Sequence, residues 1–129
     1  MNDAPWHAHI YAGSGRLADA GALRKRFEGA LATREIDGLR FVGALADRAV
    51  GPHPLPQFEL HFTGSARRAV RALIEASGLT ALIHPLTDND LADHTTLAQW
   101  IGAPLALDLS VLDPPGVNLG LARFGRSDM

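Results

Sequence analysis

The chain has no cysteine among its 129 residues, so disulfides, thiolate metal sites and cysteine nucleophiles are excluded. No stretch comes near the roughly 18 consecutive apolar residues that span a bilayer, and the first residues lack the basic flank and apolar run of a signal peptide. A basic block is missing too, because 12 Lys and Arg stand among 14 Asp and Glu. We therefore expect a cytoplasmic protein that binds neither a membrane nor nucleic acid.

Histidine, in contrast, is well represented. Six residues of this type occur in the chain, and imidazole is both the commonest metal ligand and the natural acid–base group near neutral pH. Composition alone is compatible with chance enrichment, so the placement of the histidines in the fold has to decide whether they form a site. The six are His7, His9, His53, His61, His84 and His94.

The spacing of apolar residues predicts the order of helices and strands. A two-residue alternation is typical of strands, and apolar residues three and four positions apart are typical of helices. On this basis we predict strands over residues 6–12, 39–47, 57–63 and 80–85, helices over 16–35 and 65–78, a third helix over 87–102 and a last short strand over 105–112. We expect one domain over residues 1–129, with a tail from about residue 113 that is loose or packs on a partner.

The first six elements run strand, helix, strand, strand, helix, strand. This order matches the ferredoxin-like βαββαβ plan, so we predict an α+β fold with an antiparallel sheet and an appended C-terminal helix and short strand. In that plan both helices cover one face of the sheet. The other face must be covered by solvent, by an extension of the chain or by a second subunit.

Polar side chains are predicted to gather on this open face. In the first strand the apolar residues should face the helices, which sends His7, His9 and Tyr11 to the open side. The same alternation sends Glu59 and His61 of the third strand there. Because the first and third strands are neighbours in the centre of a ferredoxin-like sheet, two polar rows would lie side by side.

The other three histidines lie in a loop or near the end of an element. Two prolines restrict the backbone around His53, and His94 falls on the apolar stripe of the third helix, so we expect it to point inward. His84 is the last strand residue before a proline and could point to either face. A single buried histidine is more often a structural residue satisfied by one hydrogen bond than a metal ligand. Two histidines with a carboxylate could instead form the facial triad that binds non-haem Fe(II).

Four stretches together are similar to a known family. They are "HAHIY", "VGPHP", "LIHPLT" and "DLADHTTLAQWIGAPLALDLSVL", and the likeness runs from about Trp6 to Leu112. The chain resembles the DOPA 4,5-dioxygenase family in its small bacterial and fungal form. The resemblance implies a ferredoxin-like fold and extradiol cleavage of a catechol such as L-DOPA between ring positions 4 and 5. Ala46 stands where the family's second strand often ends with a histidine.

The resemblance, combined with the expected sheet face, suggests roles for individual residues. We expect non-haem Fe(II) as the cofactor, with zinc or another divalent metal as the alternative, and a catechol and O2 as the small-molecule partners. The expected metal ligands are His9, His84 and Glu59, with His53 as the other choice for the third; the acid–base candidates are His7, His53 and His94; the substrate-binding candidates are Arg48, Tyr11 and Trp100.

Two other kinds of protein would also account for these features. One is a module that binds a metal or a small aromatic molecule without turnover. The other is a structural dimer whose polar sheet face is an interface between subunits, since open ferredoxin-like sheets often pair; a homodimer is expected in any case. A tightly held stoichiometric metal would favour the first of these over the second.

Overall fold

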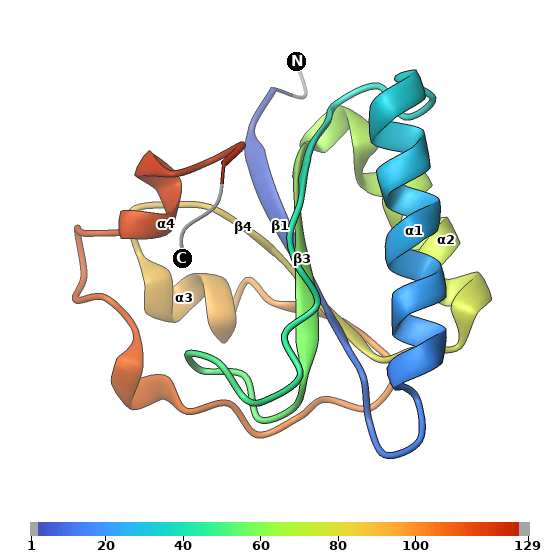
Figure 1. Cartoon of the computed structure of the whole chain (residues 1–129). Helices are drawn as coiled ribbons and strands as arrows, with labels where there is room; N and C mark the ends of the chain where they lie inside the picture. The colour runs from blue at the N-terminus through green and yellow to red at the C-terminus, as the bar shows by residue number, and fades with distance from the viewer. Residues whose placement is uncertain (1–2, 127–129) are drawn as a thin grey trace.

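An antiparallel sheet of five strands divides the molecule into two layers (Figure 1). The computed structural model describes residues 3–126. The strands lie in the order β2-β3-β1-β4-β5, and every neighbouring pair is antiparallel. Their bounds are β1 Pro5–Tyr11, β2 Leu39–Val42, β3 Gln57–Thr63, β4 Ala81–Pro85 and β5 Gln99–Ile101. The predicted α+β class is confirmed, and β1 and β3 are adjacent as expected.

Two long helices, α1 (Leu17–Thr33) and α2 (Arg67–Ser77), pack on one face of this sheet (Figure 1). The strand residues predicted to face them are fully buried, among them Ile10 of β1 and Phe58 of β3. Phe27 of α1 is equally inaccessible and belongs to the same core cluster. Burial of these apolar side chains is the main favourable contribution to folding, so the two-residue alternation in the strands orients the whole sheet.

The third predicted helix is too long, and the last strand lies at 99–101 instead of the predicted 105–112. Only Asp90–His94 forms a helix, α3, which begins where the Asn89 side chain accepts a hydrogen bond from Ala92 N at 3.0 Å. Farther along the predicted helix, Gln99–Ile101 forms β5 instead, because pairing with the edge of β4 satisfies the hydrogen-bonding groups of its backbone. Residues 105–112 pair with no described strand and contain one short 3-10 turn, η2 (Leu109–Val111).

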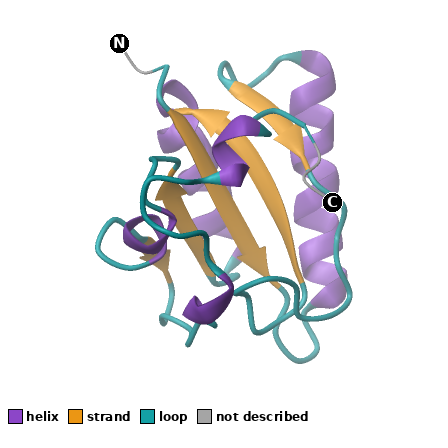
Figure 2. Ribbon diagram, turned by 90° about the vertical axis from the view of Figure 1, so that its left-hand side faces the viewer, coloured by secondary structure: helices purple, strands orange, loops and turns teal. Residues whose placement is uncertain are grey.

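The face opposite α1 and α2 is covered by the chain itself. Figures 1 and 2 show α3, α4 (Leu119–Ala122) and long loops lying over that face. We call residues 102–126 the C-terminal segment; it is joined to the body by hydrogen bonds such as Asp108 N to Pro52 O at 2.8 Å. The expectation of a loose tail also concerns residues 127–129, which lie outside the described part. Within residues 3–126, no helix has the length and apolar character needed to cross a membrane.

We predict that the apolar layer between sheet and helices dominates stability. Phe58→Ala should lower the free energy of unfolding by about 3–5 kcal/mol, because it removes a fully buried ring and leaves a cavity. Leu17→Ala, at a position 47% exposed at the start of α1, should change it by less than about 0.5 kcal/mol. Urea denaturation measures both values. Equal losses for the two variants would contradict this assignment of the core.

Candidate active site

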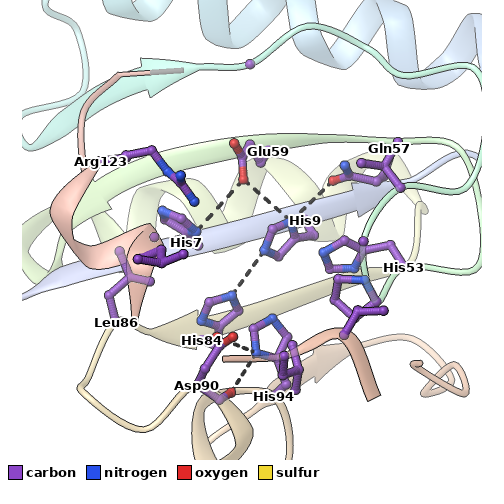
Figure 3. A pocket seen from close by; sticks show the side chains of 18 of the residues that line it. His7, His9, His53, Gln57, Glu59, His84, Leu86, Asp90, His94 and Arg123 are labelled. Atoms are coloured by element: carbon purple, nitrogen blue, oxygen red, sulfur yellow. Dashed lines mark hydrogen bonds and ion pairs between the residues drawn. The ribbon is translucent and has the colours of Figure 1, made fainter. Parts of the chain in front are cut away.

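A pocket of about 300 Å³ lies between the polar face of the sheet and its cover. Most of the histidines, and three carboxylates, contribute to its wall. Figure 3 shows the histidines of β1, β4, α3 and the proline-rich loop converging on one space. The lining residues with polar or charged side chains are His7, His9, His53, Gln57, Glu59, His84, Asp90, His94, Asp113, Asn118 and Arg123.

The strand register brings the polar rows together. His9 of β1 lies opposite Glu59 of β3, and His7 lies between His61 of β3 and His84 of β4. The two adjacent polar rows predicted from alternation are therefore confirmed. His84, whose orientation the sequence left open, points into the pocket, because alternation in β4 places Ala81 and Ile83 in the apolar core on the other face.

Two histidines of the pocket contact each other directly, since His9 Nε2 and His84 Nε2 lie 3.0 Å apart. His84 Nδ1 lies 2.7 Å from Pro85 O, which only accepts, so Nδ1 carries the proton. His9 Nδ1 likewise faces Gln57 Oε1 at 3.2 Å and donates to it. In their neutral forms both imidazoles therefore turn an Nε2 lone pair toward the other. Such an arrangement is unfavourable unless a cation or a shared proton lies between the two nitrogens.

Burial away from water keeps these imidazoles neutral. Burial, together with the neighbouring His94, lowers the pKa of His84 to about 3. Burial also holds the pKa of His7 and His9 well below the ordinary 6.5, with His84 and His53 as the largest additional causes, respectively. A neutral imidazole offers a lone pair, so these side chains are in the protonation state that a metal ligand requires.

A second set of histidines flanks this pair. His53 Nδ1 lies 2.7 Å from the hydroxyl of Tyr11, whose pKa is raised by burial, so the phenol keeps its proton. His94 Nδ1 donates to Asp90 O at 2.8 Å and lies 3.3 Å from Asp90 Oδ1, which leaves its Nε2 lone pair available. Two groups, His7–His9–His84 and His9–His53–His94, have ligand atoms within 4.8 Å of one another and could hold a metal ion.

Glu59 lies on the side of the His9 ring opposite to the contact between His9 and His84. Its Oε2 lies 3.9 Å from Nδ1 of both His7 and His9, whereas His84 meets His9 through Nε2. The ligand atoms of Glu59 group with those of His7 and His61. The structure thus brings His9 and His84 together and places the third expected ligand, Glu59, beside the opposite ring nitrogen of His9.

His61, which we assigned no role from the sequence, contacts Glu59 directly. Gly125 N donates to His61 Nδ1 at 2.9 Å, so in the neutral ring the proton is on Nε2. That Nε2 lies 3.3 Å from Glu59 Oε1. His61 is fully buried and stacks on His7 with ring centroids 4.0 Å apart. This N–H makes no hydrogen bond within residues 3–126, and it places a proton beside the carboxylate instead of a lone pair that could bind a metal.

The three side chains expected to bind substrate do not line the pocket. Arg48 is exposed and lies 3.6 Å from the carboxylate of Asp47. Tyr11 and Trp100 stack on one another with centroids 6.0 Å apart, and Tyr11 supports His53. The pocket wall contains Arg123 instead, and Ala46 also lies in it. Sequence reasoning missed Arg123 because the tail around it has no period from which a direction could be read.

A buried hydrogen-bond network attaches the C-terminal segment to α3. Asp93 is fully buried; its oxygens accept from Thr87 N at 2.9 Å, Thr87 Oγ1 at 2.7 Å and Asn118 Nδ2 at 3.1 Å. Burial raises the pKa of Asp93 even so. Because Asp93 directly precedes His94, this network fixes both α3 and the segment that closes the pocket.

The fold and this group of buried histidines define a protein that could hold a metal ion over an antiparallel sheet. Residues 6–111 match the Dopa 4,5-dioxygenase family. The match covers most of the chain, so the chain belongs to that family, and the resemblance seen in the sequence is confirmed.

Individual relatives are similar to parts of this chain. The DOPA 4,5-dioxygenase of Amanita muscaria is 31% identical over 113 residues, covering 83% of this chain and 49% of that protein. An uncharacterized 21.2 kDa protein of Botryotinia fuckeliana is 36% identical over 76 residues, covering 51% of this chain and 42% of that one. The chain thus spans about half the length of the curated relatives or less. The crystal structure of a candidate dioxygenase from Nostoc punctiforme superposes with a TM-score of 0.73 at 26% identity, covering 84% of this chain and 90% of that one.

We predict that the metal-free protein loses stability as the pH falls below 6.5. The unfolded chain takes up protons on its histidines near pH 6.5, whereas the folded chain keeps His7, His9 and His84 neutral. The contribution of these histidines to the free energy of unfolding is therefore complete above pH 6.5. It declines as the pH falls toward 3, by up to about 1.4 kcal/mol per pH unit for each such histidine. Thermal melting in chelator between pH 7.5 and 5 measures this slope.

His84→Gln provides the comparison, because it removes one of the three groups. Its melting temperature should fall less steeply with pH than that of the wild type. An identical slope for the two proteins would show that His84 takes up a proton as readily in the folded state as in the unfolded one.

Proposed function

We propose that this protein is an extradiol ring-cleaving dioxygenase that opens a catechol, such as L-DOPA between ring positions 4 and 5, with O2 and a histidine-bound non-haem Fe(II). The observation that carries the proposal is the buried contact of 3.0 Å between His9 Nε2 and His84 Nε2. Two metal–nitrogen bonds of about 2.1 Å at a right angle would put their nitrogens about 3.0 Å apart. Membership of the dioxygenase family supports the same assignment.

The donor set suits a divalent metal. His9 and His84 would hold it, and the third ligand would be Glu59, His53 or His7, all in the pocket wall. Three protein ligands would leave positions on bound Fe(II) for both catechol oxygens and for O2. Zinc or another divalent ion would be held by the same atoms.

In this proposal the histidines that do not bind the metal transfer protons. The Nε2 atom of His7 is buried and has no hydrogen-bond partner within residues 3–126, and the ring lines the pocket. A neutral imidazole there can accept a proton from a catechol hydroxyl and return it to the product. His53 and His94 are the other acid–base candidates. Both atoms of O2 enter the product, which carries an aldehyde and a carboxyl group where the ring carbon–carbon bond was broken.

The size of the pocket fits a single aromatic ring. At about 300 Å³ it lies at the small end of the roughly 300–1,000 Å³ range of small-molecule sites. Apolar Phe41, Val50 and Leu112 contribute to the wall together with the polar groups. Location in the cytoplasm and assembly as a homodimer complete the proposal. A dimer formed through the polar sheet face is disfavoured, since the chain covers that face itself (Figure 2).

Turnover can be tested directly. The protein is loaded anaerobically with Fe(II), mixed with L-DOPA or another catechol, and then exposed to air. We expect a yellow ring-opened product, and the reaction should consume one O2 for each ring opened. His9→Ala and His84→Ala should lower the rate at least about 100-fold, because each removes a proposed ligand. Lys25→Gln, on the exposed surface of α1, is the control and should match the wild type. Stoichiometric metal without ring opening of any catechol would instead support a binding module.

The contact between His61 and Glu59 gives a separate prediction about metal affinity. In His61→Gln the amide nitrogen replaces Nε2 and keeps an N–H beside Glu59, whereas in His61→Asn only the position of Nδ1 is kept. We expect the Asn variant to bind Co(II) about 10–100-fold more weakly and the Gln variant to stay within about threefold of the wild type. Titration followed by the visible spectrum of Co(II) measures this. Equal weakening in both variants would contradict a role for the donor at Nε2.

A further inference from the structure

Arg123 is the one cationic side chain among the described residues that line the pocket. It follows α4 directly and belongs to the C-terminal segment. The backbone of α4 lies close to His7, because a Cβ placed on Gly120 would be 3.9 Å from His7 Cε1. Figure 3 shows the Arg123 guanidinium beside His7, at the far end of the histidine group from His53.

The hydrogen-bonding capacity of Arg123 is not used up within the protein. Its Nε atom is buried and has no hydrogen-bond partner among residues 3–126. A buried N–H of a charged group is costly to leave unsatisfied, so a partner is expected in the pocket. An arginine fork fits a carboxylate with two parallel hydrogen bonds.

The three carboxylates of the pocket wall have other contacts. Glu59 faces His7, His9 and His61. Asp90 Oδ2 accepts from Asp113 N at 2.9 Å, and Asp113 Oδ2 accepts from Leu119 N at 2.8 Å. These contacts hold the acids in place at their own sites along the wall. Arg123 is therefore positioned to meet an anion that enters with the ligand.

We propose that Arg123 forms an anion subsite that binds a carboxylate on the side chain of the ring substrate and selects acidic catechols over neutral ones. This inference rests on the proposed function, which places the catechol oxygens at His9 and His84. A short acidic side chain then extends toward α4, where the guanidinium lies. Arg48, the residue suggested by the sequence, is exposed and outside the pocket wall, so we assign it no part in this selection.

Binding to the Zn(II)-loaded protein tests the subsite without turnover. The ligands are 3-(3,4-dihydroxyphenyl)propanoate and its methyl ester, which differ at the carboxylate alone, and titration calorimetry gives the two dissociation constants. The wild type should bind the acid at least about tenfold more tightly than the ester. In Arg123→Gln this ratio should fall to about one through weaker binding of the acid, and Arg123→Lys should keep part of it.

Two further variants complete the design. Arg126→Gln removes an exposed arginine of the same segment and should keep the wild-type ratio. Arg48→Gln should keep it as well; loss of the preference there would overturn the assignment to Arg123. The inference is also overturned if Arg123→Gln keeps the ratio, if it weakens acid and ester equally, or if the wild type does not prefer the acid. A preference that depends on Arg123 without ring opening in the turnover assay would refute the proposed reaction alone.

Discussion

The site depends on one unfavourable contact, in which two buried imidazoles turn lone pairs toward each other. Pro85 O and Gln57 Oε1 accept from the Nδ1 atoms of His84 and His9, so the facing Nε2 atoms, 3.0 Å apart, are both acceptors. A proton could bridge them, but burial and the neighbouring histidines lower the pKa of both rings. A divalent cation satisfies both lone pairs at once without needing a proton. The architecture around the pair can be understood as what keeps this contact in place.

The sheet supplies the rigidity for that contact. β1 is a central strand with a hydrogen-bonded neighbour on each side, so His7 and His9 are held by two ladders. Their neighbours in the strand, Ala8 and Ile10, are fully buried against the helices. A shift of the register by one residue would turn the histidines into the apolar core, and the cost of that burial excludes it. The apolar layer thus determines which way the polar row faces.

How much of this the sequence could predict depends on the range of the interactions involved. Alternation is a local property, so the sequence alone is enough to place His7, His9 and Glu59 on one face. The direction of His84 depends on which face of β4 meets the core, a choice made by packing between distant elements. Gln99–Ile101 has apolar spacing compatible with a helix, and pairing with β4 overrides that preference.

The C-terminal segment shows where sequence reasoning ends and why the site needs it. It has no period, yet it contributes Asn118, Asp113 and Arg123 to the pocket wall, and hydrogen bonds that span more than twenty residues hold the first two in place. The N–H of Gly125 donates to His61 Nδ1, so the proton of the neutral His61 ring is on Nε2. This Nε2 faces Glu59, and Glu59 in turn faces His9. Closure of the pocket and orientation of a metal-binding imidazole are therefore linked by the same few atoms. A segment with no helical or strand pattern of its own connects the cover of the pocket to its centre.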